Sequence, residues 1–450
     1  METPLKWLGQ IRLNPMHIVV LFFLLVILLG SFLLYLPVSS QPGKSISYVD
    51  ALFTSASAAD VTGLVVVDLA NQFSFFGKMV ILVLIQIGGL GYMALATFFL
   101  IMLGKSISLR HRLFFSESMN RPSLANIIGF AKYIFLNIVA IELIGALLLF
   151  LFWRHDFGAW KAVKMGIFHS ISAFNNAGFD LMGNFRSLTA YVDNTGVNLT
   201  IALLIVIGGL GFVVLAELYD RAKHGKRLSL HSKIVLIMSV MLIITGAVFF
   251  GIVESSNPAT LGPLSLKGKV LSSFFQSVSA RTAGFNTIDL GLATKASLLI
   301  IMILMFIGAS PGGTGGGIKT TTFSILTANI AAAVRDKDDV EMLNRKIPRE
   351  IVHKSVAIFF ISLFAVLVVT MLVSIFDNLQ PMNILFEVVS AFGTVGLSTG
   401  ITPSLSDASK LLLAFMMFAG RVGTLTLILF FATKKSTGRV ELPDEPVPVG

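Results

Sequence analysis

The sequence predicts an all-α integral membrane protein with eight transmembrane helices and four re-entrant half-helices around one central pore. Two observations carry this prediction. The 450-residue chain is 55% hydrophobic and only 13% charged, with a mean hydropathy of +0.85, which is too apolar for an ordinary soluble protein. Apolar stretches of about 20 residues, the length of a membrane-crossing helix, also alternate along the chain with shorter apolar segments.

The predicted crossing helices are distributed over the whole chain. They are His17–Leu36, Phe73–Leu103, Ile127–Trp153, Val197–Tyr219, Ile234–Val253, Ala296–Asn329 with an interruption, His353–Phe376 and Ala408–Thr433. The first is longer than the apolar core of a signal peptide and no small-residue cleavage site follows it, so we expect it to be retained.

Basic residues gather in the connections that follow every second helix. They include Lys105, Arg110, Arg112, Arg221, Lys223, Lys226, Arg227, Lys233, Arg335, Arg345, Lys346, Arg349, Lys354, Lys434, Lys435 and Arg439. By the positive-inside rule these connections and both termini face the cytoplasm of a multi-pass cell-membrane protein. The net charge of +10 is therefore an orientation signal and does not indicate nucleic-acid binding.

The opposite connections contain apolar segments that are too short to cross a bilayer and suit re-entrant half-helices. They are Tyr48–Ala58, Ala162–Phe174, Val270–Ala280 and Asn383–Phe392.

These segments reveal a fourfold repeat. Each has Ser-Ala, three or four residues, Gly, then Leu or Phe, with the glycines at Gly63, Gly178, Gly284 and Gly396. A second glycine cluster follows in each next helix. The repeats cover residues 1–110, 111–225, 226–345 and 346–440, and a tail covers 441–450.

Non-helical backbone at membrane depth is tolerated only where it lines water or is buried in protein. Four such loops can meet around one axis, where backbone carbonyls replace part of an ion's water shell and half-helix dipoles point their negative ends. The ligand should be a cation. For the glycines of 88–91 and 208–211 close helix packing is the favoured interpretation, whereas the four loop glycines favour the pore.

With these motifs the chain resembles the Trk, Ktr and HKT potassium transporter superfamily, and within it the membrane subunits of bacterial Ktr systems, the KtrB type. The resemblance implies a carbonyl filter for potassium, with no cofactor in this chain. The implied filter residues are Val61, Thr62, Gly63, Asn176, Ala177, Gly178, Thr282, Ala283, Gly284, Thr394, Val395 and Gly396. Some plant relatives that favour sodium have serine at the first glycine, so Gly63 favours potassium.

The third repeat contains a glycine-rich interruption that should break its helix. The resemblance implies an intramembrane gate there, made of Gly308, Pro311, Gly312, Gly313, Thr314, Gly315, Gly316, Gly317 and Lys319, facing Arg421 of the fourth repeat. A phosphate-binding loop is rejected, because Ile318 separates Gly317 from Lys319 and no strand precedes the segment. Arg421 needs a partner at membrane depth: either carbonyls of this segment, which would form a barrier, or an acidic residue that locks two helices.

Arg281 lies beside the predicted filter, and Asp60, Asp289 and Glu387 are its candidate partners. The resemblance also implies a homodimer in contact with lipid and a cytoplasmic KtrA-like ring that binds the regulatory nucleotide. A coupled symporter with alternating access is the alternative, although four repeats in one orientation favour a pore over inverted repeats. No pattern typical of a membrane enzyme is present.

Overall fold

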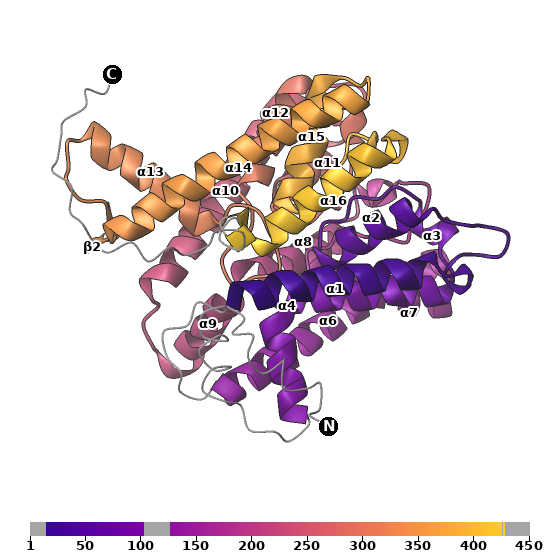
Figure 1. Ribbon diagram of the computed structural model, residues 1–450, viewed down its shortest axis with the longest axis horizontal. Helices are drawn as coiled ribbons and strands as arrows, with labels where there is room; N and C mark the ends of the chain where they lie inside the picture. The colour runs from indigo at the N-terminus through magenta and orange to yellow at the C-terminus, as the bar shows by residue number, and fades with distance from the viewer. Residues whose placement is uncertain (1–14, 103–126, 425, 428–450) are drawn as a thin grey trace, which may run out of the picture.

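The computed structural model describes residues 15–102, 127–424 and 426–427, and it is almost entirely helical (Figure 1). Each repeat opens with a long helix: α1 (Pro15–Tyr35), α6 (Ile127–Phe157), α10 (Leu230–Glu254) and α14 (Arg349–Phe376). A half-helix follows each of them: α2 (Tyr48–Ala59), α7 (Ala159–Phe174), α11 (Leu266–Ser279) and α15 (Pro381–Gly393). The half-helices begin and end within four residues of the predicted segments.

The second long helix of each repeat is divided in the structure. These helices are α4 (Phe75–Met102), α8 (Thr195–Leu210) with α9 (Phe212–His224), α12 (Lys295–Phe306) with α13 (Thr320–Val334), and α16 (Asp407–Val422). The backbone leaves helical geometry at Gly91 (φ 70°) inside α4, at Gly211 (φ 97°) between α8 and α9, and at Gly423 (φ 95°) after α16. The prediction that only the third repeat has a broken helix was therefore wrong.

Four of the described helices are each long and apolar enough to cross a membrane. They are His17–Tyr35, Ile134–Phe157, Leu230–Glu254 and Arg349–Phe376, with mean hydropathies of 2.6 to 3.0. The pair α8 and α9 passes the same test together but is bent by 100°. Val197–Tyr219 is thus not the single straight helix that was predicted, because glycine permits a φ at position 211 that ends the helix there.

Short elements complete the connections. They are α3 (Leu69–Gln72), the 3₁₀ turns η2 (Pro37–Ser39), η3 (Thr189–Tyr191), η4 (Leu290–Leu292) and η5 (Thr402–Ser404), and the antiparallel pair β1 (Glu341–Met342) and β2 (Arg345–Lys346). In Figure 1, α3 lies at the right end of the molecule, whereas α9, α13 and β2 lie toward the left.

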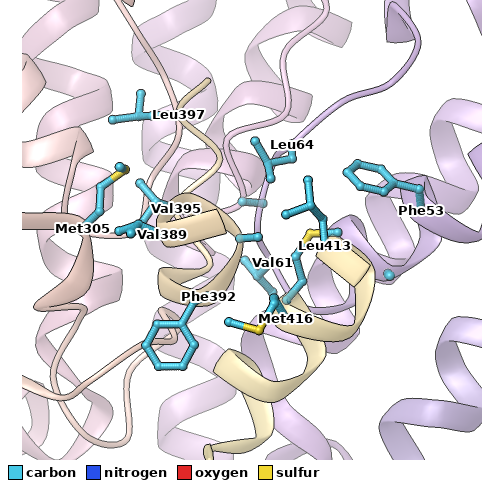
Figure 2. Close-up of a cluster of buried hydrophobic side chains, with 14 of the residues drawn as sticks. Phe53, Val61, Leu64, Met305, Val389, Phe392, Val395, Leu397, Leu413 and Met416 are labelled. Atoms are coloured by element: carbon cyan, nitrogen blue, oxygen red, sulfur yellow. The ribbon is translucent and has the colours of Figure 1, made fainter. Parts of the chain in front are cut away.

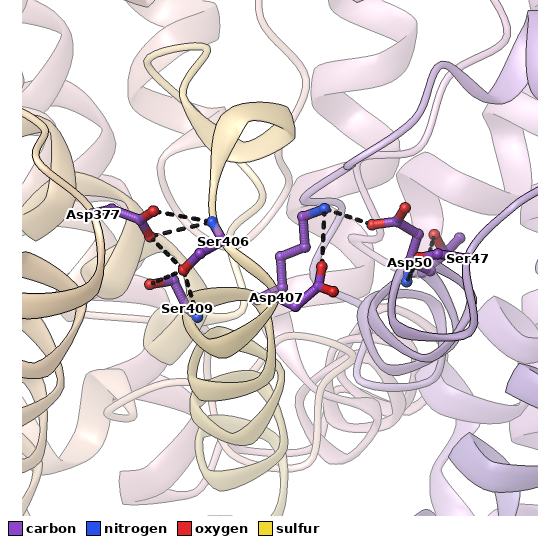
Figure 3. A network of polar contacts seen from close by, with 8 residues as sticks. Ser47, Asp50, Asp377, Ser406, Asp407 and Ser409 are labelled. Carbon is purple, nitrogen blue, oxygen red and sulfur yellow. Dashed lines mark hydrogen bonds and ion pairs between the residues drawn. The ribbon is translucent and has the colours of Figure 1, made fainter.

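The first and last repeats pack against each other, so the four repeats close into a ring. Helix α16 contacts α2, and Lys410 forms a largely buried ion pair with Asp50 at 2.7 Å (Figure 3). The start of α16 is fixed to the end of α14, because the Asp377 carboxylate accepts hydrogen bonds from the backbone N–H and hydroxyl of Ser406. The pairing of Lys410 with Asp50 avoids the free-energy cost of burying either charge without a counter-charge.

An apolar core lies behind the first and fourth loops (Figure 2). It brings Val61 and Leu64 of the first loop together with Val395 of the fourth, Met305 of α12 and Leu413 of α16. All five side chains are buried. Close packing of this kind restricts the loop backbones to one arrangement.

Candidate functional site: a ring of glycine loops and the broken segment beneath it

Each half-helix ends in a loop with the same backbone conformation. Two positions per loop have positive φ: Val61 (57°) and Gly63 (92°), Asn176 (58°) and Gly178 (69°), Thr282 (71°) and Gly284 (79°), Thr394 (49°) and Gly396 (87°). Glycine adopts such angles readily, but they are unusual for a β-branched residue. Strained backbone kept in four copies is typical of a functional site.

The four glycines form a closed ring. A Cβ added at Gly178 would lie 2.8 Å from the Ala283 carbonyl oxygen, and one at Gly284 would lie 2.6 Å from that of Val395. Gly63 faces the Ala177 carbonyl and Gly396 faces that of Thr62, both more closely still. Each loop therefore abuts the next, in the order one, two, three, four and back to one, and no side chain fits at these positions.

All four ring glycines line one cavity of about 620 Å³, which we call the vestibule. Asp180 and Asp289 also line it. The other predicted filter residues lie in the same loops and are fully buried: Val61, Thr62, Asn176, Ala177, Thr282, Ala283, Thr394 and Val395. The structure thus brings every predicted filter residue to one place, with backbone carbonyls crowded around the glycines.

The serine of each Ser-Ala pair braces its loop. The hydroxyl of Ser57 donates to the Leu64 carbonyl at 2.8 Å and accepts from the Gly63 N–H at 3.0 Å. Ser172 and Ser279 donate to the equivalent carbonyls, and Ser390 accepts from the Gly396 N–H. These serines are part of the predicted repeat, but no role was predicted for them.

The interruption of the third repeat crosses beneath the ring, on the side away from the vestibule. At one end the Thr314 N–H donates to the Gly208 carbonyl of the second repeat at 3.2 Å. At the other end the Gly316 N–H donates to the Thr394 hydroxyl at 2.9 Å and the Gly317 N–H to the Gly420 carbonyl at 3.3 Å. This broken segment, residues 307–319, therefore contacts the second and fourth repeats directly.

Arg421 links the broken segment to the first repeat. Its guanidinium donates to the Thr314 carbonyl and to the Gly88 carbonyl of α4. Lys319 is similarly held, since its Nζ donates to the Gly315 carbonyl at 2.7 Å. Among the described residues Arg421 makes no ion pair. Carbonyls are thus its hydrogen-bond partners, and the buried carboxylate of Asp60 interacts with it electrostatically without forming an ion pair.

Comparison with known proteins now identifies the family. Residues 10–441 match the family described as TrkH, cation transport protein. The chain is 41% identical over 449 residues to the Ktr system potassium uptake protein B of Bacillus subtilis, covering 100% of this chain and 99% of the relative. It is 39% identical to the protein of the same name from Vibrio alginolyticus, covering 96% and 94%. It is 36% identical to the potassium/sodium uptake protein NtpJ of Enterococcus hirae, covering 98% of each.

The chain belongs to the TrkH cation transport family. This confirms the resemblance inferred from the sequence, and with it the prediction of a transport protein and not an enzyme. The crystal structure of the potassium transporter TrkH from Vibrio parahaemolyticus has the same fold, with a TM-score of 0.72 at 20% identity, over 94% of this chain and 86% of that one.

Arg281 of this TrkH-family chain is buried beside the ring but pairs with none of the three predicted anions. Its Nη1 donates to the Ser239 carbonyl of α10 at 3.3 Å. Asp289 instead caps η4, and Glu387 accepts hydrogen bonds from Ser398 and Thr402 among others. A carbonyl satisfies part of a buried guanidinium without an ion pair, and sequence spacing gave no sign of this choice.

A buried polar network between the first two repeats was not predicted. The Glu142 carboxylate of α6 accepts hydrogen bonds from Asn175, which directly precedes Asn176 in the second loop, at 3.0 Å and from Gln86 of α4 at 3.3 Å. Asn175 also donates to Gln86 at 2.9 Å. The sequence did place Glu142 alone among apolar residues, which is a signal of a buried partner at membrane depth.

A packing repeat was also missed. Gly30, Gly145 and Gly246 of the first helices face the hydroxyls of Ser55, Ser170 and Ser277 of the half-helices. Each hydroxyl donates to a carbonyl of the facing helix. In the fourth repeat Val388 occupies the serine position. The signal was present in the sequence, because each of these serines lies two residues before the Ser-Ala serine.

Proposed function

We propose that this chain carries potassium into the cell through one pore whose filter is the ring of glycine loops. The single observation that carries the proposal is that four loops from four repeats present buried carbonyls and side-chain-free glycines to one cavity. Carbonyl oxygens coordinate a dehydrated potassium ion well. The printed names of the relatives from Bacillus and Vibrio, both potassium uptake proteins, support the choice of ion.

The broken segment and Arg421 act as the gate of this pore. Gly308, Pro311 and the residues up to Lys319 lie between the ring and the opposite side of the membrane, where they are tied to the second and fourth repeats. Arg421 places a cation against the same segment. A positive charge in a narrow passage opposes the movement of potassium. Hydrogen bonds from the guanidinium to buried carbonyls hold Arg421 in place.

The chain acts as the translocating subunit of a Ktr system. It is a homodimer of eight-helix protomers, each with its own pore, in the cell membrane. The basic connections and both termini face the cytoplasm, where a KtrA-like ring binds nucleotide and controls the gate. This chain itself needs no cofactor, and the membrane potential drives uptake.

The test is potassium and sodium uptake in cells that lack their own potassium transporters. The wild-type chain should restore growth at low potassium. The variant Gly63→Ser should lose preference for potassium over sodium, because its new side chain meets the Ala177 carbonyl of the next loop. The sodium measurement matters because the name of the Enterococcus relative pairs both ions.

The matched control is Gly43→Ser, since Gly43 also has positive φ (78°) but nothing lies within 4 Å of an added Cβ. It should behave as wild type. Failure of the wild-type chain to restore growth, with protein present in the membrane, would contradict the proposed transport. Unchanged ion preference in Gly63→Ser would contradict the proposed filter.

A further inference from the structure

A large groove lies between α4 and α7, beside the vestibule and separate from the ring. Its volume is about 710 Å³, and Met79, Leu82, Val163 and Ile167 form much of its apolar wall. Asn184 lines both this groove and the vestibule. The groove therefore opens at the same end of the molecule as the vestibule.

The groove faces the lipid. Phe75, Met79 and Val83 follow one another at four-residue spacing along α4, and they are 67%, 41% and 52% exposed. Such spacing places them on one face of the helix. Trp160, in the first turn of α7, is 74% exposed. Exposed tryptophan is typical of the level of the lipid headgroups, so the groove extends from that level into the hydrocarbon layer.

Three lysines line the groove, namely Lys78, Lys161 and Lys164, and no carboxylate does. Lys78 Nζ donates to the Ala70 carbonyl at 2.7 Å. The Lys164 ammonium lies 5.1 Å from the ring centre of Trp160 and 5.5 Å from that of Phe75. Within the described part of the chain, none of these lysines forms an ion pair.

Asp68 lies two residues before Ala70, which lines the groove, but Asp68 itself does not line it. Its carboxylate accepts hydrogen bonds from the backbone N–H groups of Asn71 and Phe185. Asp68 also interacts electrostatically with Lys78. Lys161 and Lys164 are therefore the groove lysines that lack a carboxylate partner within the described residues.

We propose that this groove binds one anionic phospholipid. The phosphate lies between Lys161 and Lys164 at the mouth, and an acyl chain covers the apolar wall. Lysine stems pack along apolar surface while their ammonium groups reach the headgroup level. A second copy of the chain is a poorer occupant, because a symmetric contact would bring the same lysines of both copies together without a counter-charge.

The test is native mass spectrometry of the full-length chain purified in detergent, with phosphatidylglycerol or phosphatidylcholine of identical acyl chains added. Wild type should retain one phosphatidylglycerol in preference to phosphatidylcholine. The variant K161Q/K164Q should bind phosphatidylglycerol about 30-fold more weakly, since each basic residue near a lipid surface contributes about 1 kcal/mol. Met79→Trp, which fills the groove without altering charge, should also displace the lipid.

The matched control is K267Q/K295Q. Both lysines are exposed, and they lie in the first turns of α11 and α12 outside the groove. This variant should retain the lipid. Equal retention of both lipids by wild type, or unchanged retention by K161Q/K164Q, would overturn the proposal. Displacement by free glycerol phosphate as effective as by phosphatidylglycerol would mean a simple anion site and would also overturn it.

Cysteine cross-linking tests whether a second copy of the chain occupies the groove. The chain has no cysteine of its own, so Trp160→Cys introduces a single thiol at the mouth of the groove. We expect little disulfide-linked dimer after mild oxidation in membranes. Efficient cross-linking would assign the groove to a contact between copies and overturn the lipid proposal.

Discussion

The ring of glycine loops and the broken segment beneath it are constructed in different ways. In the ring, each loop has a residue with positive φ, a glycine with positive φ and a serine brace. The broken segment exists once, and its contacts with the second, fourth and first repeats are all different. Backbone forms the ring in four equivalent parts, whereas the segment is held by backbone hydrogen bonds together with the side chains of Arg421 and Thr394.

This difference predicts opposite outcomes of mutation. The ring has no spare space, so a change in one loop displaces the carbonyls of its neighbour and should abolish the proposed transport. The broken segment is held in position by hydrogen bonds to the second and fourth repeats, so loss of the bonds from Arg421 should loosen the proposed gate. Variants of the two regions therefore test the comparison directly.

The largest effect is expected for Gly284→Ala. Its Cβ would lie 2.6 Å from the Val395 carbonyl oxygen at a φ of +79°, an overlap that only movement of the ring backbone relieves. Potassium uptake should fall by about tenfold or more, since misplacing coordinating groups by an ångström is costly. The measurement is uptake per membrane-inserted protein.

Gly43→Ala is the control for this variant. Gly43 has nearly the same φ, +78°, but open space around its Cβ, so it separates strain of the backbone from the collision between loops. It should transport normally. Uptake by Gly284→Ala within twofold of this control would show that the ring tolerates displacement.

Arg421→Ala tests the other side of the comparison and should increase potassium flux. The substitution removes two hydrogen bonds from a charged donor to the Thr314 and Gly88 carbonyls, each worth about 1.5–3 kcal/mol. The flux of reconstituted protein without a regulatory partner should rise by about tenfold or more, limited by full opening. Arg421→Lys should be intermediate.

Arg335→Ala is the control, because Arg335 is exposed at the end of α13. Its flux should match that of wild type. If Arg421→Ala gives equal or lower flux at the same protein level, the side chain stabilises the fold and the barrier lies elsewhere.

The parts of the structure that repeat were predictable from the sequence. Ser-Ala and glycine at fixed spacing located all four loops, because a loop that ends a half-helix at membrane depth needs these residue types. Pro311 and the glycines around it located the broken segment for the same reason. In these places the local sequence by itself excludes a continuous helix.

The breaks at Gly91, Gly211 and Gly423 were not predictable in this way. Each of these glycines belongs to a glycine cluster, and such a cluster in an apolar run is also compatible with a straight helix that packs closely against its neighbours, so tertiary contacts decide the outcome. At position 211 the break is fixed by the broken segment, because the Phe212 N–H donates to the Gly312 carbonyl at 3.0 Å. Arg281 is a second case. Its partner is the backbone carbonyl of Ser239, and every residue type has such a carbonyl, so the sequence does not indicate which one is used.

The smallest effect is expected in the vestibule, where side chains and not backbone carry the charge. Burial raises the pKa of the Asp180 carboxyl, the hydrogen bond from the Met182 N–H lowers it and the nearby Asp68 carboxylate raises it, so that the pKa is about 6. Asp180 is therefore an anion at neutral pH that attracts cations toward the ring, and it becomes neutral as the pH falls through about 6. At low ionic strength, uptake should drop by about twofold over this change.

Asp180→Asn should remove this pH dependence and leave uptake at its low-pH value. Asp338→Asn, which alters an exposed carboxylate before β1, should retain it. Uptake is measured at fixed potassium over the pH series, with and without added salt, because screening should abolish the effect in wild type. A pH step that persists in Asp180→Asn would show that another group titrates. It would contradict the role of Asp180 in attracting cations to the ring.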